Sequence, residues 1–313
     1  LALEQAKAAD AAHLARNVGG ALHGVPVGIK DIFDTWDMPT ENGSPIYAGR
    51  RPQADATAVS RLREAGAIIL GKTVTTEFAT FHPGKTRNPH DPARTPGGSS
   101  SGSAAAVADH MVPLAIGSQT VGSVIRPAAF CGVVGYKPSF GRIGRFGLVL
   151  NAWSLDHVGI MTPSVDDCAL VYSALCGPDP MDPSTLDGPI PASTIDMTGF
   201  KAPKIGLIRD YFMETSSPMM QASVEAALQA CAAAGAEVVE VKLPELFRLS
   251  WYAHGVLFAT ERMTRESAFK SDAPQKRLPT GRTLFMPDAV ARLIPTPYYL
   301  QSQRIKRVLQ EQM

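Results

Sequence analysis

A stretch rich in glycine and serine, from Thr95 to Pro138, constrains what this chain can form more than any other part of it. Two glycine–serine clusters lie in it, at 97–103 and 120–123, with a small-residue helical pattern and an apolar run between them. Glycine loses much backbone entropy on folding and small side chains bury little apolar area, so the stretch is poor core material. It suits a loop whose backbone N–H groups approach a reacting atom closely. We interpret it as the cradle of an active site.

The bulk composition is that of an ordinary globular protein. The chain has 313 residues, enough for one large α/β domain or two smaller ones, with 45% hydrophobic and 19% charged residues. Because the formal net charge is only +1, the sequence predicts no nucleic-acid partner and no membrane partner. No apolar run approaches the ~20 residues that span a bilayer, and no secretory signal is evident. Both ends interrupt helical patterns, so we expect the sequence to be incomplete at both.

The cysteines and histidines predict neither a metal centre nor a disulfide framework. The four cysteines are scattered without a C-x-x-C spacing: Cys131, Cys168, Cys176 and Cys231. The seven histidines form no H-x-x-x-H pattern. A reducing, cytoplasmic location is the default expectation for such a chain.

Hydrophobic periodicity predicts an α/β protein, because strand and helix patterns alternate along the chain. Strands are expected in a segment that ends near Lys30 and at 67–70, 112–116, 132–136, 204–209 and 236–243. Helices are expected at 1–18, 55–66, 103–110, 163–175 and 219–235. A linker rich in Pro, Asp and Ser follows at 177–200, and the last seventy or so residues have mostly helical patterns. The residues 201–245 then form a second α/β unit, which we expect on the same sheet.

Residues 66–73 match the nucleotide-binding pattern G-x-x-x-x-G-K-[ST] letter for letter. A phosphate-binding loop needs a strand before its first glycine and a flexible loop between the two glycines. Here a helix precedes Gly66, and the residues before Gly71 are themselves a strand pattern. We therefore favour a helix end followed by a buried strand, and keep a nucleotide-binding protein as a remote alternative.

Residues 98–102 match the nucleophile elbow G-x-S-x-G, with Ser100 at its centre. That elbow must follow a strand, whereas 88–96 carries three prolines and is loop-like. Asp156 and His157 are adjacent in sequence and would point in different directions, so they are poor partners for a Ser-His-Asp triad. The sequence therefore disfavours this kind of site.

A catalytic serine without a histidine partner needs another base. Lysine serves when it is neutral, which requires that burial or a nearby positive charge lower its pKa from about 10.4. Lys30 ends an apolar strand pattern and is flanked by Ile29 and Ile32, so we expect partial desolvation. A solvated surface lysine is the alternative interpretation.

Several linked motifs then make the chain similar to a known family. The segments GVPVGIKD at 24–31, PGGSSSGSAAAVA at 96–108 and SQTVGSVIRPAAFCGVVGYKPS at 118–139 resemble the amidase signature family. Residues 154–163 resemble its downstream segment, so the match runs from about 20 to 180. The loop around Ser123 looks closest to the malonamidase-like branch rather than to the amidotransferase A subunit.

The resemblance implies the amidase-signature fold, a mixed central β-sheet covered by helices on both faces. It predicts a single domain over 1–313 with its signature core at 67–180. Residues 78–94 and the segment after Phe247 are expected to line the substrate pocket.

The resemblance also implies a Ser–Ser–Lys triad with no metal and no organic cofactor. Lys30 matches the catalytic lysine, Ser99 the bridging serine at an unusual cis peptide, and Ser123 the nucleophile. The backbone N–H groups that would hold the oxyanion belong to Thr120, Val121, Gly122 and Ser123. Supporting or substrate-binding positions are Gly98, Ser100, Gln119 and Arg126.

Some positions depart from the family pattern. Val121 and Ser101 stand where glycine is usual, Gln119 replaces the commoner aspartate, and Arg126 lies one place later than usual. The changes at Gln119 and Arg126 are expected to compensate each other, since the family's Asp–Arg pair becomes a neutral Gln near a displaced Arg. Arg126 is expected either to bind a substrate carboxylate or to be structural.

The sequence therefore predicts an amidase that hydrolyses a small carboxylic amide to a carboxylate and ammonia or an amine, through an acyl-enzyme. The alternative is the glutamine-hydrolysing A subunit of an amidotransferase complex. The expected partner is a small-molecule amide, and a homodimer remains an open alternative.

Overall fold

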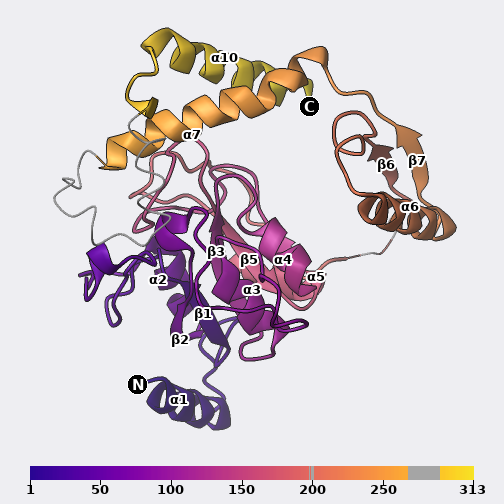
Figure 1. Ribbon diagram of the computed structural model, residues 1–313. Coiled ribbons are helices and arrows are strands. Elements are labelled where there is room, and N and C mark those ends of the chain that lie inside the picture. The colour runs from indigo at the N-terminus through magenta and orange to yellow at the C-terminus, as the bar shows by residue number, and fades with distance from the viewer. Residues whose placement is uncertain (197, 199–200, 267–289) are drawn as a thin grey trace. The chain divides into compact units, whose positions relative to one another are not determined.

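The computed structural model describes residues 1–196, 198, 201–266 and 290–313 (Figure 1). The chain divides into two compact units, one of residues 1–195 with 258–293 and one of residues 196–257 with 294–313. The candidate site lies in the first unit. The single domain over 1–313 stays a prediction.

The first unit is built on a five-stranded mixed sheet. Its order is β2-β1-β3-β5-β4, with β1 parallel to both β2 and β3, and β5 antiparallel to β3 and β4. The strands are β1 (Pro26–Lys30), β2 (Ile68–Thr73), β3 (Leu114–Gln119), β4 (Val134–Tyr136) and β5 (His157–Thr162). Every residue of β3 is buried, as expected for a central strand. The mixed sheet of the predicted fold class is thus confirmed.

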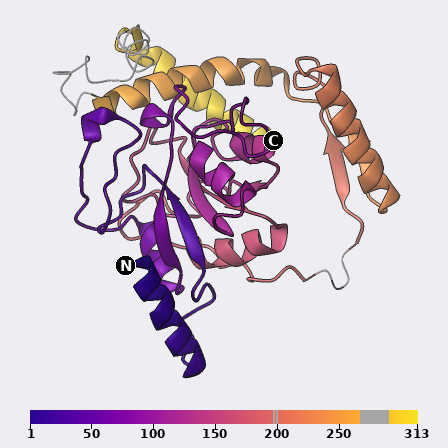
Figure 2. The ribbon, with the colours of Figure 1, turned by 60° about the horizontal axis from the view of Figure 1, so that its bottom comes forward.

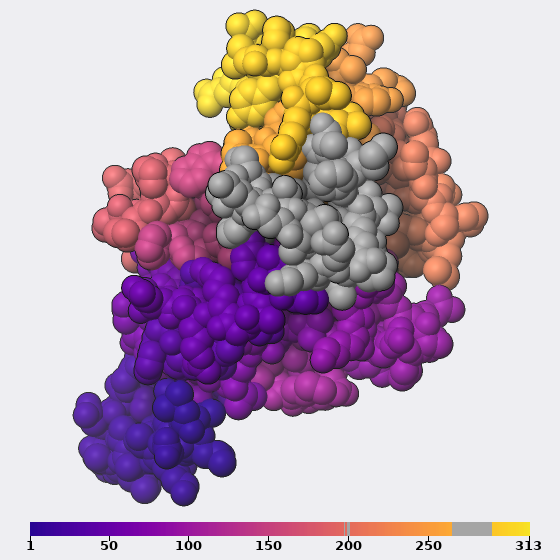
Figure 3. Space-filling model, turned by 60° about the vertical axis from the view of Figure 1, so that its left-hand side comes forward, coloured from indigo at the N-terminus to yellow at the C-terminus, as the bar shows by residue number. Residues whose placement is uncertain are grey.

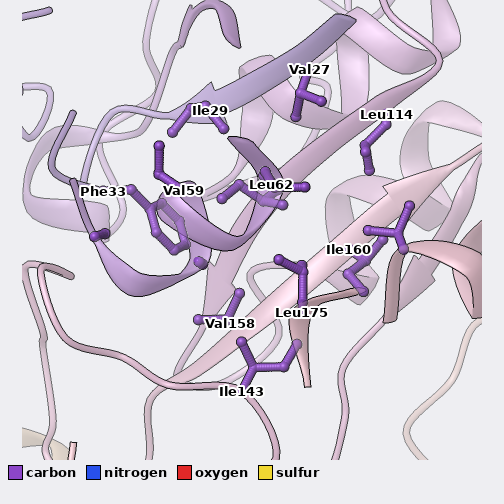
Figure 4. Close-up of a cluster of buried hydrophobic side chains, with 14 of the residues drawn as sticks. Val27, Ile29, Phe33, Val59, Leu62, Leu114, Ile143, Val158, Ile160 and Leu175 are labelled. Carbon is purple, nitrogen blue, oxygen red and sulfur yellow. The ribbon is translucent and has the colours of Figure 1, made fainter. Parts of the chain in front are cut away.

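Helices cover both faces of this sheet (Figures 1 and 2). They are α2 (Thr57–Glu64), α3 (Ser101–Ala108), α4 (Ile125–Cys131) and α5 (Val165–Leu175). Helices α2 and α5 share the larger hydrophobic cluster with Val27 and Ile29 of β1 (Figure 4). Helices α3 and α4 belong to a second cluster with Ala115 and Met161. Because side chains alternate along a strand, Lys30 lies on the face of β1 opposite Ile29, toward α3.

The local sequence explains how two of these helices begin and end. Helix α2 buries Ala58, Val59 and Leu62 and stops before Gly66, whose φ is +90° and whose missing Cβ would lie 2.3 Å from the Gly19 carbonyl oxygen. Helix α5 is capped by the Ser164 hydroxyl, and Asp166 and Asp167 occupy its first turn, where carboxylates favour the helix dipole.

Helix α1 (Ala2–Leu14) is the least integrated element of the first unit. It buries no residue, and its indigo atoms form a separate lobe on the surface (Figure 3). Its mixed, alanine-rich composition offers no apolar stripe for the sheet to cover.

Two elements of the first unit were absent from the sequence expectation, β5 and α4. Pro127 lies in the first turn of α4, where proline is tolerated, but it disguises the helical pattern. Strand β5 follows a turn-rich segment and has the pattern of a short apolar run. These two elements were not predicted from the sequence because each is short and its hydrophobic pattern is weak.

The second unit contains β6 (Lys204–Leu207), α6 (Pro218–Ala233) and β7 (Glu237–Glu240) in a parallel β-α-β arrangement. Here the expectation of a single sheet is wrong, because β6 and β7 pair with each other in a separate two-stranded sheet. A strand joins a sheet only through backbone hydrogen bonds to a neighbour, and periodicity within 201–245 does not encode that neighbour. The linker before it has neither helix nor strand over 177–196.

The described C-terminal part is helical, as expected. Helix α7 (Ser250–Glu266) follows a short 3-10 turn at Glu245–Leu249, and α10 (Thr296–Gln312) packs against that turn. The rest of the predicted helical segment, 267–289, lies outside the described residues. Among the described residues, no helix combines the length and the apolar character that crossing a membrane requires.

Candidate active site

Lys30 is the last residue of β1 and is fully buried. Its Nζ donates to Ser99 Oγ at 2.7 Å, to Ser118 Oγ at 2.9 Å and to the Ser118 carbonyl oxygen at 3.3 Å. Ser118 lies near the end of β3, the strand next to β1. The sheet therefore brings a lysine and two serines that are far apart in sequence into one buried cluster.

Burial is the main influence on the pKa of Lys30, since an ammonium loses its hydration in the interior. It lowers the pKa of Lys30 from 10.5 to about 7, while the charge of Asp156 acts in the upward direction and that of Arg126 in the downward direction. A large fraction of Lys30 is then uncharged near neutral pH, and an uncharged amine can accept a proton.

Ser99, the residue expected to bridge, lies on an unusual backbone. The Gly98–Ser99 peptide bond is cis, and Ser99 is 1% exposed. The Ser99 carbonyl accepts from the Thr76 N–H at 3.2 Å. Gly97 has φ +78°, and a Cβ there would lie 2.9 Å from Pro127 Cα, so only glycine fits.

Arg126 is directed at this same peptide. Its Nε and Nη2 donate to the Gly98 carbonyl oxygen at 3.0 and 2.5 Å. Of the two expectations for Arg126, these contacts favour the structural one, because the guanidinium is already engaged by the backbone next to Ser99.

Gln119 organises the loop at 120–124. Its Oε1 accepts from the N–H groups of Val124 and Ile125 at 2.9 and 3.0 Å, and its Nε2 donates to the Val121 carbonyl at 3.1 Å. The Gln119 amide thus both caps the start of α4 and hydrogen-bonds to the loop. A carboxylate could accept from the two N–H groups but could not donate to the carbonyl. These bonds join Gln119 to the loop and Arg126 to Gly98, and none of them joins the two side chains to each other.

Ser123 is joined to the cluster through its backbone. Its carbonyl accepts from the Ser100 N–H at 3.2 Å, next to Ser99. The two glycine–serine clusters of the sequence therefore lie against each other. The Val121 side chain is 49% exposed, so it does not pack into the core.

Ser100 is a buried structural neighbour of these groups. Its Oγ donates to the Ser118 carbonyl and accepts from the Ser118 N–H, both at 3.3 Å. A Cβ on Gly117 would collide with that hydroxyl at 2.6 Å. Ser100 thus fixes the end of β3 that carries Ser118.

The structure brings two residues near the site that the sequence did not place there, Ser118 and Asp156. Asp156 is 3% exposed, and its carboxylate accepts from the Thr120 hydroxyl. The only sequence signal for either was its place in a motif of the resemblance, since neither residue type is distinctive alone. Their positions follow from strand pairing, because β5 aligns Asp156 with the end of β3 and β3 carries Ser118 beside β1.

The structure removes the nucleotide-binding alternative at 66–73. Residues 68–73 are strand β2 rather than a phosphate-binding loop. Lys72 donates to the Phe33 carbonyl at 2.7 Å and to Thr40 Oγ1 at 2.8 Å, and it pairs with Asp31 at 3.3 Å. This lysine stabilises the turn after β1. The elbow at 98–102 likewise follows a loop, not a strand.

A cavity of about 520 Å³ opens at the carboxyl ends of β1 and β2. Asp31, Ser44 and Thr75 line it together with residues 83–85, which belong to the loop expected to line a pocket. Parallel strands commonly present ligand sites at this end. Within the described parts of the chain, no group of three or more His, Cys, Asp or Glu residues is placed to hold a metal ion.

The chain is similar to known proteins over most of its length. It is 44% identical over 249 residues to the A subunit of the glutamyl-tRNA(Gln) amidotransferase of Roseiflexus castenholzii, covering 77% of this chain and 50% of that protein. The corresponding Azoarcus protein is 43% identical over 280 residues, with 86% and 57% covered. The chain spans about half the length of the curated relatives it matches.

Solved structures show the same fold. The native peptide amidase from Stenotrophomonas maltophilia superposes with a TM-score of 0.84 and 32% identity, covering 97% of this chain and 68% of that one. The A subunit of the glutamyl-tRNA(Gln) amidotransferase from Thermotoga maritima gives 0.80 and 32%, with 93% and 65% covered. A chain from a complex described as revealing the origins of an s-triazine catabolic enzyme gives 0.87 and 34%, with 99% and 68% covered.

The family model named Amidase matches residues 1–313. The predicted family is therefore confirmed, while the placement in a malonamidase-like branch stays a prediction. With the fold, the buried Lys30 cluster and these similarities agreeing, the chain belongs to the Amidase family.

Proposed function

We propose that this protein hydrolyses a small carboxylic amide through a Ser–Ser–Lys triad. The observation that carries the proposal is the 2.7 Å hydrogen bond between Ser99 and a fully buried Lys30 whose pKa lies near 7. A hydroxyl next to an uncharged amine has a route for its proton, which is the requirement for nucleophilic catalysis by serine.

The proton path begins at Ser123. Lys30 takes the proton of Ser99, Ser99 takes that of Ser123, and Ser123 Oγ forms a bond to the amide carbonyl carbon. The carbonyl π electrons move to its oxygen, and the relay returns a proton to the leaving nitrogen as the C–N bond breaks. Water then releases the carboxylate by the same path, which regenerates Ser123.

The developing oxyanion would be held by backbone N–H groups at 120–123. The Gln119 amide and the hydrogen bond of the Thr120 hydroxyl hold this loop in place before substrate arrives. Preorganised donors matter because each is worth about 3 kcal/mol of transition-state stabilisation where one has been removed.

A second candidate is the glutamine-hydrolysing subunit of an amidotransferase. The 44% identity to a protein of that name favours it. The same triad would then release ammonia for a partner subunit. Turnover of simple amides by the isolated protein favours the first candidate, and glutamine turnover that requires a partner favours the second.

The decisive variant is Ser123→Ala. We expect ammonia release from a panel of amides, with and without a free carboxylate, to fall by more than ~10³-fold with the fold unchanged. Ser223→Ala, on the exposed face of α6 in the second unit, is the matched control and should leave turnover unchanged. Full turnover by Ser123→Ala contradicts the assignment of the nucleophile.

A further inference from the structure

Asp156 is a buried carboxylate that the proposed triad does not use. Its Oδ2 accepts from the backbone N–H groups of Asn151 and Ala152 at 2.5 and 3.1 Å, and its Oδ1 accepts from the Thr120 hydroxyl. No ion pair to this carboxylate is found within the described residues. Keeping a charge buried without a direct countercharge is unfavourable, so its retention calls for a role.

Strand register places Asp156 beside the proposed oxyanion loop. His157 of β5 pairs with Gln119 of β3, so the residues just outside that pair, Asp156 and Thr120, also lie side by side. Ser118, on the other side of Gln119, contacts Lys30. One short length of β3 and its extension therefore connects the proposed base with the first residue of the oxyanion loop.

The electrostatic surroundings give the carboxylate a second effect. The negative charge of Asp156 raises the pKa of Lys30 and so opposes the effect of burial, whereas the positive charge of Arg126 lowers that pKa. Burial raises the pKa of Asp156 itself, and the hydrogen bonds from Thr120 and from the backbone at 151–152 act against that rise. The three hydrogen bonds therefore favour the ionised carboxylate that an effect on Lys30 requires.

Other charged groups nearby are engaged elsewhere or neutral. Arg145 donates to the Asp156 carbonyl at 3.2 Å, and its guanidinium is paired with Asp182. The neighbouring His157 has a pKa lowered to about 4, first by burial and then by Lys137, so it is neutral near pH 7. Asp156 is thus the carboxylate whose charge acts on Lys30.

The segment before Asp156 is anchored from a helix. Glu261 of α7 accepts from the Ser154 N–H and hydroxyl at 2.7 and 2.6 Å. This anchor holds the 151–156 turn, whose N–H groups bind the Asp156 carboxylate. The carboxylate therefore has a fixed position from which to act.

We propose that Asp156 is a positioning residue of the amide-hydrolysing site. It fixes Thr120, and with it the first N–H of the oxyanion loop, and its negative charge stabilises the ammonium that forms when Lys30 receives the proton of Ser99. Asp156 exchanges no proton in this scheme. The proposal rests on the proposed function. It adds to that site a carboxylate that does not touch the substrate.

Two variants separate the two effects. Asp156→Asn removes the charge but keeps hydrogen bonds on both sides: its amide oxygen can accept from the N–H groups of Asn151 and Ala152, and its NH2 can donate to the Thr120 hydroxyl. Thr120→Val removes the hydroxyl and keeps the charge, with Thr120→Ser as its conservative partner. Asp166→Asn, in the exposed first turn of α5, controls for loss of a carboxylate elsewhere.

Each variant is tested by two rates measured against pH. One is amide turnover, and the other is labelling by a fluorophosphonate probe, which reacts with an activated serine without needing an amide substrate. We expect Asp156→Asn to lower both rates about tenfold. We also expect the acidic limb of the profile to shift to a lower pH by about one unit, because the Lys30 ammonium loses a favourable charge and its pKa falls.

Thr120→Val should lower the plateau of turnover about tenfold and leave the acidic limb in place, with Thr120→Ser close to wild type. An Asp156→Asn profile identical to wild type overturns the proposal. If Asp156→Asn does not fold, equal turnover of Thr120→Val and Thr120→Ser overturns it. Absence of any amide turnover or labelling in the wild type defeats the proposed function instead, which keeps the two failures distinct.

Discussion

Two lysines on neighbouring parallel strands are both shielded from solvent, but within the described residues only one of them has a carboxylate in direct contact. Lys30 ends β1 among hydroxyls and a carbonyl, with its closest contact to Ser99. Lys72 lies on β2 opposite Ile29, and its side chain meets the carboxylate of Asp31, with a carbonyl and hydroxyls completing its contacts. Burial lowers both pKa values, but the charge and hydrogen bond of Asp31 oppose the effect at Lys72.

The difference teaches which surroundings allow a buried lysine to lose its proton. Desolvation lowers the pKa of both lysines, and at Lys72 a carboxylate in direct contact opposes that lowering. Lys72 forms an ion pair with Asp31, whereas the acceptors that Lys30 contacts are neutral and stabilise its charged form less. Four predictions test this contrast, beginning with the largest expected effect.

Lys30→Met should abolish amide turnover while stabilising the fold. Loss of the proposed base should lower turnover by ~10³-fold or more. Because the folded-state pKa lies below the unfolded one, the wild type gains stability as pH rises from about 7 toward 10.5, and it lacks that stability at pH 7 and below. Thermal unfolding should therefore show the variant more stable at pH 7, with the advantage shrinking above it. A variant that unfolds earlier at pH 7 contradicts the desolvation argument.

Lys72→Met should do the reverse. It leaves the partly buried Asp31 without its partner and should cost about 3 kcal/mol of unfolding free energy, measured by urea denaturation. Turnover per folded molecule should be retained, and nucleotide should not bind to wild type or variant. Lys7→Met on the exposed face of α1 is the control. Adding Asp31→Asn to Lys72→Met should recover part of the loss, and no recovery would remove the ion pair from the explanation.

The pH profile of turnover should show the state of Lys30 directly. The reactive form is the uncharged amine, so the rate should rise tenfold per pH unit below about 7 and level off above it. Steady-state assays between pH 5 and 9 measure this limb. A profile whose acidic limb lies near pH 4 to 5 would assign the base to a carboxylate instead.

Ser118→Ala should have the smallest effect. A neutral amine has two N–H donors and one lone pair, and Ser118 supplies two acceptors that orient the lone pair toward Ser99. The variant keeps the carbonyl and loses the hydroxyl, so we expect about a tenfold fall in kcat with KM unchanged. Ser118→Thr should restore most of the rate. Equal loss in both variants would point to packing rather than to orientation of the amine.

The sequence was most informative where local pattern and motif agreed. The strand ending at Lys30, the helix at 163–175 with its acidic first turn, and the false nucleotide loop at 66–73 could all be interpreted from periodicity and turn residues. The family followed from linked motifs. The short α4 and β5, and the separate sheet of β6 and β7, could not be predicted this way.

Residue types and their order along the chain were set by the sequence alone: an apolar strand that ends in lysine, two glycine–serine clusters, and a family to which they belong. Tertiary structure decided which groups meet. Strand pairing brought Lys30 to Ser99 and Ser118, and it placed Asp156 beside Thr120. Those contacts span 36 to 88 residues of sequence. Hydrogen bonding across a sheet depends on register, and desolvation depends on everything packed around a charge, so neither is written in any local stretch.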